Sequence, residues 1–310
     1  FHTALRFVQQ GWEVAGFDNF NEVIYKKDLK WDRAKYLGEH NVDVDYIDLK
    51  KSSDVSKYIK EHEPDLVVHL AAHAGVRISM NKGQEYIKNN IVGTQNLIDA
   101  LEKYKIENVI YASTSCTMEG NPLPWSPNEK LGPQLNPYGY SKQTNENQFQ
   151  TSSIPNAVCL RFFTVYGPWG RPDMALFKFT KNILEDKPIQ VHNYGNHYRD
   201  FTYIDDIVDG ISKIHSVIPS KVGSEGNQFA SEVYNVGNGN PINLLDFIKE
   251  LELNLDKSAE KILVDMQPGD VDKTFADIGK LNSAIGYEPK ISFKDGIKIF
   301  IDWYKTFYKI

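Results

Sequence analysis

Tyr138 and Lys142 have the residue types and the spacing that proton transfer requires, in the segment Tyr-Gly-Tyr-Ser-Lys. Residues four apart share one face of an α-helix, so the phenol and the ammonium can point into the same site. A tyrosine becomes an effective base only when a neighbouring cation stabilises its phenolate, and Lys142 would supply that cation. Taken alone, this spacing also occurs in many surface helices.

A hydroxyl cluster directly upstream strengthens the catalytic interpretation. An apolar segment ends on Ser113, Thr114 and Ser115. A hydroxyl at the end of a strand can relay a proton between a substrate and Tyr138. We therefore predict that Thr114, Tyr138 and Lys142 form a catalytic group. Tyr140 is a rival phenol, but no lysine follows it at the same spacing.

The elements that must position these residues alternate between strand and helix. Apolar runs predict strands over residues 12–19, 64–72, 108–114 and 157–163, and apolar spacing predicts helices over 3–10, 85–104 and 137–150. Continuous apolar runs are typical of parallel strands that are covered on both faces. The fold class is therefore predicted as α/β, with a doubly wound, parallel, Rossmann-type sheet.

The regular alternation of strands and helices ends after residue 163, where a Pro/Gly-rich turn is followed by a helix. Further strands are predicted over 189–194 and 232–236, and further helices near 244–251 and 294–307. We expect an NAD-binding domain over residues 1–164, with a strand returned to it near 200–238. Residues 165–310 are expected to form a smaller, mixed α/β substrate domain.

The first strand of such a domain and its glycine-rich, pyrophosphate-binding turn are absent from this chain, which opens inside the helix that should follow them. We expect that the sequence is truncated there, rather than that the protein lost its phosphate-binding turn.

Several strand ends suit a nicotinamide dinucleotide. Asp18 could accept both ribose hydroxyls of NAD and would repel the extra phosphate of NADP. A turn formed by Asp18 and Asn19 explains the same aspartate equally well. Asp48 and Leu49 could contact the adenine, and the segment Leu70, Ala71, Ala72 leaves room for backbone to approach a flat ligand, although these residues also suit plain packing.

Composition excludes several classes of function. The net charge of −6 gives no broad basic field for nucleic acid or an anionic membrane. Two cysteines, Cys116 and Cys159, are too few for a disulfide framework or a usual zinc cluster, so we predict no metal and a reducing, cytoplasmic location. No apolar run approaches the ~20 residues that span a bilayer, which predicts no membrane partner.

With these motifs in place, the chain resembles the extended short-chain dehydrogenase/reductase family, and within it the NAD-dependent nucleotide-sugar epimerases, closest to UDP-glucuronate 4-epimerases. The most specific matching block begins at Arg161, and it has Thr164 where galactose-type epimerases usually have asparagine. The matching stretches are DNFNEVIY (18–25), HLAAHAGVRISM (69–80), NNIVGTQNLI (89–98), RFFTVYGPWGRPDMALFKFTK (161–181), NYGNHYRDFTYIDDI (193–207), YNVGN (234–238) and PGDVDKTFAD (268–277).

The resemblance implies roles for the matched positions. Thr114, Tyr138 and Lys142 would catalyse. The NAD contacts would be Asp18, Asn19, Asp48, Leu49, Leu70, Ala71, Ala72, Asn89, Tyr138, Lys142 and Phe162. Three residues would bind the carboxylate of the sugar: Ser115, Thr164 and Arg171. Arg199 would bind the diphosphate, Asp270 would accept from the nucleotide ribose, and Arg77 is a further candidate for binding an anionic group of the substrate. For any one of these arginines alone, a surface ion pair is the simpler explanation. The family also implies a homodimer through helices 85–104 and 137–150.

The chain departs from the family after Ser115, where Cys116-Thr117-Met118-Glu119-Gly120 replaces a serine followed by V-Y-G. This departure leaves the identity of the sugar open. The predicted function is NAD-dependent inversion of C4 of a UDP-sugar through a 4-keto intermediate, with UDP-glucuronate giving UDP-galacturonate, a precursor type for surface polysaccharides.

Other functions stay open. The first alternative is a 4-epimerase of a neutral or N-acetylated UDP-hexose, with a UDP-glucuronate decarboxylase ranked below it. A non-catalytic sensor of NAD or sugar nucleotide is an alternative of another class. A 4,6-dehydratase is excluded, because Ser115 and Cys116 cannot provide the acid/base pair that eliminates water.

Overall fold

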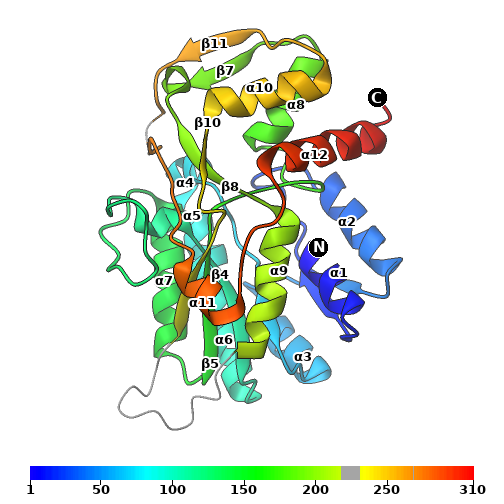
Figure 1. Cartoon of the computed structure of the whole chain (residues 1–310). Coiled ribbons are helices and arrows are strands. Elements are labelled where there is room, and N and C mark those ends of the chain that lie inside the picture. The colour runs from blue at the N-terminus through cyan, green and yellow to red at the C-terminus, as the bar shows by residue number, and fades with distance from the viewer. Residues whose placement is uncertain (218–230, 268) are drawn as a thin grey trace.

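A four-stranded parallel sheet lies at the centre of the computed structural model, which describes residues 1–217, 231–267 and 269–310. Its strands, in spatial order, are β3 (Val67–His69), β4 (Asn108–Thr114), β5 (Asn156–Phe162) and β9 (Glu232–Val236). β4 and β5 pair over their whole lengths, from Asn108 opposite Asn156 to Thr114 opposite Phe162. All four strands therefore end at the same edge, where parallel α/β sheets bind their ligands (Figure 1).

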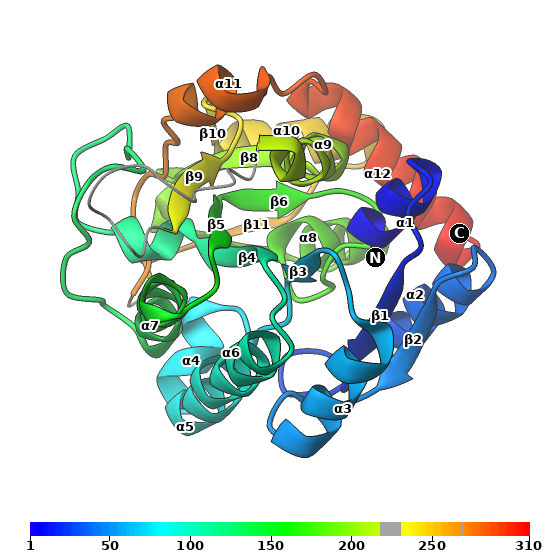
Figure 2. The same cartoon turned by 90° about the horizontal axis from the view of Figure 1, so that it is seen from below.

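Helices cover both faces of this sheet (Figure 2). α3 (Ser52–His62), α6 (Gly93–Lys103) and α7 (Pro137–Thr151) pack on one face, where they meet Val109 and Tyr111 of β4. α1 (His2–Gln9), α9 (Ile204–Ile214) and α11 (Gly279–Ile285) pack on the other, where they meet Ile110. Successive side chains of β4 thus point alternately into the two hydrophobic cores on the opposite faces of the sheet, as the continuous apolar run predicted. The predicted doubly wound α/β architecture is confirmed.

Two further strands, β1 (Ala15–Asp18) and β2 (Asp43–Tyr46), form a separate parallel pair next to α2 (Asp28–Gly38). Within the described ranges, β1 pairs only with β2 and β3 pairs only with β4. β1 to β5 and β9 therefore lie in two sheets rather than in the single sheet that the sequence suggested.

The second half of the chain builds another core. β6 (Thr164–Tyr166) pairs in parallel with β8 (Tyr198–Tyr203), and β10 (Pro241–Asn243) joins β8 in antiparallel orientation. β7 (Ile189–His192) and β11 (Lys261–Val264) form a parallel pair. α8 (Ala175–Leu184), α10 (Leu244–Leu255) and α12 (Phe293–Tyr308) enclose a core that includes the buried rings of Phe177, Phe247 and Phe300. A boundary at residue 164 remains a prediction.

The helix expected over residues 85–104 is a composite. It begins as α5 (Gly83–Tyr86), continues through the π-helical segment η1 (Ile87–Val92) and ends as α6. The short helix α4 (Val76–Asn81) precedes it. The strand expected over 64–72 is confined to β3, because Leu70 and Ala71 leave the sheet and are exposed.

Short helical turns η2 (Ser115–Met118), η3 (Asn193–Gly195) and η4 (His215–Val217) complete the described elements. Residues 218–230 of the expected strand-return region, and Pro268 of the last matching stretch, lie outside the described residues. Within the described ranges, no helix combines the length and apolarity that crossing a membrane requires, and no three His, Cys, Asp or Glu side chains are grouped as metal ligands.

Candidate active site

The three predicted catalytic residues come from the end of β4 and the first turns of α7. Thr114 is the last residue of β4, and η2 follows it at once. α7 begins at Pro137, because the side chain of Asn136 accepts a hydrogen bond of 2.8 Å from the Gly139 amide and so caps the helix. Tyr138 therefore stands in the first turn, and Lys142 lies one turn further on the same face.

The phenol of Tyr138 is in hydrogen-bond contact with the hydroxyl of Thr114. Burial raises the pKa of Tyr138 well above its usual value, and the electrostatic interaction with the Cys116 side chain raises it further. The Thr114 hydrogen bond and the Arg171 guanidinium both lower that pKa. The structure thus brings the predicted relay pair together and adds Arg171 as a cation that acts on the phenol.

Lys142 is almost fully buried, at 2% exposed. Burial lowers the pKa of its ammonium from 10.5 to about 8, opposed by the Cys159 and Glu146 side chains. Direct stabilisation of the Tyr138 phenolate by Lys142 remains a prediction. The low pKa means that Lys142 can change its charge near neutral pH.

A buried ion pair fixes α7 against the sheet. The guanidinium of Arg161 on β5 donates to both carboxylate oxygens of Glu146 on α7, at 3.0 and 2.7 Å. The hydroxyl of Ser113 on β4 donates to the same carboxylate at 2.5 Å. Glu146 lies one helical turn beyond Lys142, so this link sets the height of the catalytic helix relative to Thr114.

The predicted cofactor end contains a cavity of about 310 Å³. Two predicted NAD contacts, Asn19 and Asp48, line it, together with Phe20, Asn21, Glu22, Val23, Lys27, Trp31, Tyr46, Lys50, His73 and Glu85. His73 was missed from the sequence. It is 3% exposed, and its ring meets the Glu85 carbonyl, which leaves one ring nitrogen without a hydrogen-bond partner in the described part of the chain.

Other predicted cofactor residues contribute to a turn or to core packing. Asp18 is exposed at the end of β1 and accepts a 2.7 Å hydrogen bond from the Phe20 amide, so the turn that the sequence allowed is present. The side chain of Leu49 is buried in the core beneath α6, where only its backbone could meet a ligand. Phe162 is partly buried against the opposite core. Ala72 lies in the segment that leads from β3 to His73.

A buried asparagine pair holds the loop after β3. Asn89 donates at 3.1 Å to the side chain of Asn90, which accepts from the His73 amide at 2.7 Å and donates to the His73 carbonyl at 2.9 Å. Asn90 also donates to the hydroxyl of Ser141 on α7 at 2.9 Å. Asn90 was not singled out from the sequence, although two adjacent asparagines inside an apolar helix were a usable signal.

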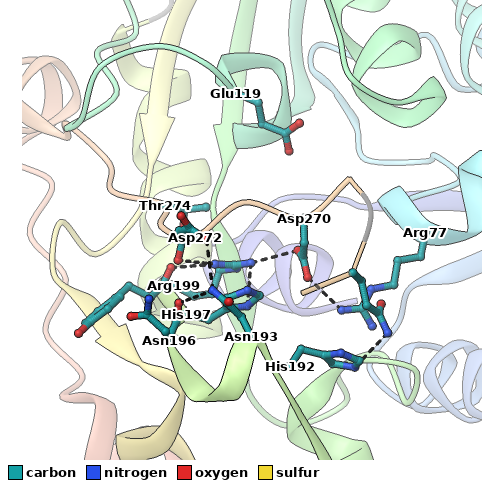
Figure 3. Close-up of polar contacts among 12 residues, drawn as sticks. Arg77, Glu119, His192, Asn193, Asn196, His197, Arg199, Asp270, Asp272 and Thr274 are labelled. Atoms are coloured by element: carbon teal, nitrogen blue, oxygen red, sulfur yellow. Dashed lines mark hydrogen bonds and ion pairs between the residues drawn. The ribbon is translucent and has the colours of Figure 1, made fainter. Parts of the chain in front are cut away.

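The predicted nucleotide residues form one charged cluster (Figure 3). Arg77 donates to one oxygen of Asp270 at 3.2 Å, and Arg199 donates to the other at 3.0 Å. Arg199 is further held by the carbonyls of Tyr198 and Asp272 at 3.0 and 3.2 Å. Two guanidinium groups thus share one carboxylate, which leaves the cluster positive and suited to an anion.

Of the residues predicted at the sugar carboxylate, Arg171 has the richest contacts. It makes a two-pronged ion pair with Asp173, at 3.0 and 2.6 Å, and donates to the Ala74 carbonyl at 3.3 Å. Ser115 is buried in η2, and Thr164 is half-buried on β6. The structure therefore places Arg171 near enough to Tyr138 to lower the pKa of the phenol, and the ion pair that the sequence allowed for this arginine is present, although it is partly buried and not on the open surface.

Comparisons with known proteins fit this arrangement. Residues 1–237 match the family model described as "NAD dependent epimerase/dehydratase family". Protein CapI of Staphylococcus aureus is 41% identical, over 99% of this chain and 96% of its own length. A UDP-glucuronate 4-epimerase of Thermodesulfobacterium geofontis is 35% identical, over 96% of this chain and 90% of its own length.

A solved structure agrees with these relatives. The UDP-glucuronic acid 4-epimerase of Bacillus cereus, in complex with UDP-glucuronic acid and NAD, superposes with a TM-score of 0.87 at 33% identity, over 99% of this chain and 96% of its own. On the family match and on these relatives, the chain belongs to the NAD dependent epimerase/dehydratase family.

Proposed function

We propose that this chain is a nucleotide-sugar 4-epimerase that uses NAD and interconverts UDP-glucuronate and UDP-galacturonate. The observation that carries the proposal is the contact between the Tyr138 phenol and the Thr114 hydroxyl, with Arg171 close enough to lower the pKa of the phenol. This contact lies at the carboxyl edge of the parallel sheet, where α/β proteins bind nucleotides. The two named 4-epimerases to which the chain is similar support the choice of substrate.

The residues present fit NAD. The cavity beside Asn19 and Asp48 contains buried His73, whose ring meets the Glu85 carbonyl and has a second nitrogen that can bond a polar ligand. Asp18 at the end of β1 would accept the ribose hydroxyls. Leu70, Ala71, Ala72, Asn89, Leu49 and Phe162 would complete the binding surface. When bound, NAD supplies reversible hydride transfer at C4 of the sugar.

The chain's own residues would handle the proton and the orientation. The Tyr138 phenol, bonded to Thr114, would take the proton of the C4 hydroxyl and return it after the keto sugar has turned. Lys142, buried one turn along the helix, would favour the charged form of the phenol. Arg171 would hold the sugar carboxylate with Ser115 and Thr164.

The charged cluster would hold the rest of the nucleotide. Arg199 and Arg77 would bind the diphosphate, and Asp270, released from them, would accept from the nucleotide ribose. Arg77 and Arg199 both donate to Asp270, which supports this assignment. A diphosphate carries more negative charge than one carboxylate, so it would compete with Asp270 for the same guanidinium groups.

We also propose that the protein is a cytoplasmic homodimer. Apolar side chains that are exposed on neighbouring helices support the dimer: Met80, Ile87, Val92 and Tyr140. Two free cysteines, with no disulfide among the described residues, suit a reducing compartment. A role in making polysaccharide precursors follows from the chemistry of the proposed product.

The proposal is tested by incubating the full-length protein and NAD separately with UDP-glucuronate, UDP-glucose and UDP-N-acetylglucosamine, with products read by proton NMR. Formation of UDP-galacturonate is the expected result. Turnover of a neutral sugar alone would keep the 4-epimerase chemistry and overturn the substrate. Binding of NAD and nucleotide without any turnover would overturn catalysis and favour a sensor.

A further inference from the structure

Glu119 is a buried carboxyl group at the carboxyl edge of the sheet that the proposed mechanism does not use. It follows η2 directly after β4 and is 8% exposed. The amide of Asn136, which caps α7, donates to it at 3.4 Å. Its carboxyl group faces the Arg199–Asp270 cluster (Figure 3). Glu119 thus belongs to the turn that follows Thr114 and also faces the charged cluster, so it would border the sugar of a nucleotide bound at both.

The surroundings of Glu119 do not neutralise its charge. In the described part of the chain, no lysine or arginine forms an ion pair with it. Two groups from neighbouring turns face it: the Cys116 thiol of η2 and the uncharged amide of Asn136, the cap of α7. Two charged groups act on it from the other side, Arg199 on β8 and Asp270, which lies three residues before the bridge between Lys273 and Tyr198. Asp270 is itself an anion, and Arg199 is already bonded to Asp270. A buried carboxylate without its own counter-ion is costly in its charged form.

The protonation of both members of the Cys116–Glu119 pair follows from this setting. Burial, then the nearby Glu119, raises the pKa of the Cys116 thiol to about 12, so the thiol stays neutral. Burial is also the main cause that raises the pKa of Glu119 to about 7; the Cys116 hydrogen bond and Arg199 oppose this, and Asp270 adds to it. Glu119 therefore changes between acid and carboxylate in the neutral pH range.

We infer that Glu119 is a specificity-determining residue of the sugar subsite, and that its side chain admits an acidic sugar nucleotide only as the neutral carboxylic acid. The inference rests on the proposed function. Ser115, one of the residues proposed to hold the sugar carboxylate, adjoins Cys116, whose side chain is hydrogen-bonded to Glu119, so a bound glucuronate brings a second carboxylate into the neighbourhood of Glu119. Two nearby carboxylates cannot both stay ionised without a large cost. As the acid, Glu119 donates a hydrogen bond to the sugar. A neutral sugar meets no such repulsion.

The expected effect is a pH-dependent preference between two nucleotides. If only the protonated form binds UDP-glucuronate, its apparent Kd scales with the inverse of the protonated fraction. That fraction falls about tenfold between about pH 6 and about pH 8 for a group with a pKa near 7. The ratio of the Kd of UDP-glucuronate to the Kd of UDP-glucose should rise about tenfold over the same range. Effects of pH on the shared UDP cancel in this ratio.

The experiment measures both dissociation constants by calorimetry on the full-length protein loaded with NAD, for wild type, Glu119→Gln and the control Glu107→Gln. Glu107 is exposed and lies just before the other end of β4. We expect the ratio to rise with pH in the wild type and in Glu107→Gln, and to stay flat in Glu119→Gln.

The outcomes separate the two claims. A wild-type ratio that does not change with pH, or a pH-dependent ratio that survives in Glu119→Gln, overturns the role of Glu119 while leaving the proposed function intact. Equal weakening of both nucleotides in Glu119→Gln at every pH assigns Glu119 a purely structural role and overturns the inference. Absence of UDP-glucuronate binding at every pH overturns the proposed substrate and the inference with it.

Discussion

The buried pair of Glu146 and Arg161 gives the sharpest test of how the catalytic helix is held. Glu146→Ala removes three hydrogen bonds at once, two from Arg161 and one from Ser113. It leaves a guanidinium whose side chain is only 4% exposed, with the Pro127 carbonyl at 3.4 Å as its other partner. Breaking a buried pair by removing one partner costs about 3–5 kcal/mol, so we expect a loss of this size in the free energy of unfolding.

Urea unfolding followed by far-ultraviolet circular dichroism measures this loss. The matched control is Glu61→Ala, which breaks an ion pair of 3.7 Å between Lys57 and Glu61 whose side chains are 74% and 58% exposed. An exposed pair of this kind contributes about 0.3–0.5 kcal/mol. If Glu146→Ala destabilised the protein no more than Glu61→Ala does, the argument that this link fixes α7 would be wrong.

Three further predictions concern the site itself. Tyr138→Phe should lower kcat by about 10²–10⁴-fold in the NMR assay, whereas Tyr140→Phe, an exposed phenol two residues away, should leave kcat unchanged; equal effects of the two would contradict the assignment. Arg171→Lys, which cannot keep the two-pronged bond, should release a decarboxylated pentose product from UDP-glucuronate, and an unchanged product ratio would count against carboxylate binding by Arg171. Because burial lowers the pKa of Lys142 from 10.5 to about 8, the unfolded state binds more protons between these values, and the stability contributed by Lys142 rises with pH across that window. The difference in unfolding free energy between wild type and Lys142→Met should therefore grow in favour of the wild type from about pH 8 to about pH 10, and a constant difference would refute the pKa argument.

The sequence predicted best where one local pattern decides the structure. β4 and β9 have the predicted bounds, because each is a short apolar run. α7 begins at the predicted proline, and its cap, Asn136, is adjacent in sequence. β6 and β8 were not predicted, because β6 has only three residues and β8 mixes charged and aromatic side chains without an apolar run. α2 was missed because its side chains show little separation into apolar and polar faces.

The same distinction applies to the site. The contact between Thr114 and Tyr138 followed from the order strand end, then helix start. The role of Asp270 as a shared partner did not follow, because Arg77 lies 193 residues from it and only the tertiary fold brings the two together. Glu119 was noticed as a departure from the family, but its burial depends on how η2 packs against α7, and the anion that it faces, Asp270, is brought to it by the tertiary fold.

The π-helical segment η1 has a consequence for the history of this chain. A π turn contains one residue more than an α turn, and it is the form that a helix takes when a single residue is inserted into it. Asn90, which holds the loop after β3 through His73, lies inside this turn. Deleting one residue here would restore an ordinary helix and leave the helical segments on either side in place, but it would change which side chains of this turn point toward α7. The contact of Asn90 with Ser141 would then be at risk, so an insertion of this kind is difficult to reverse once the loop depends on it.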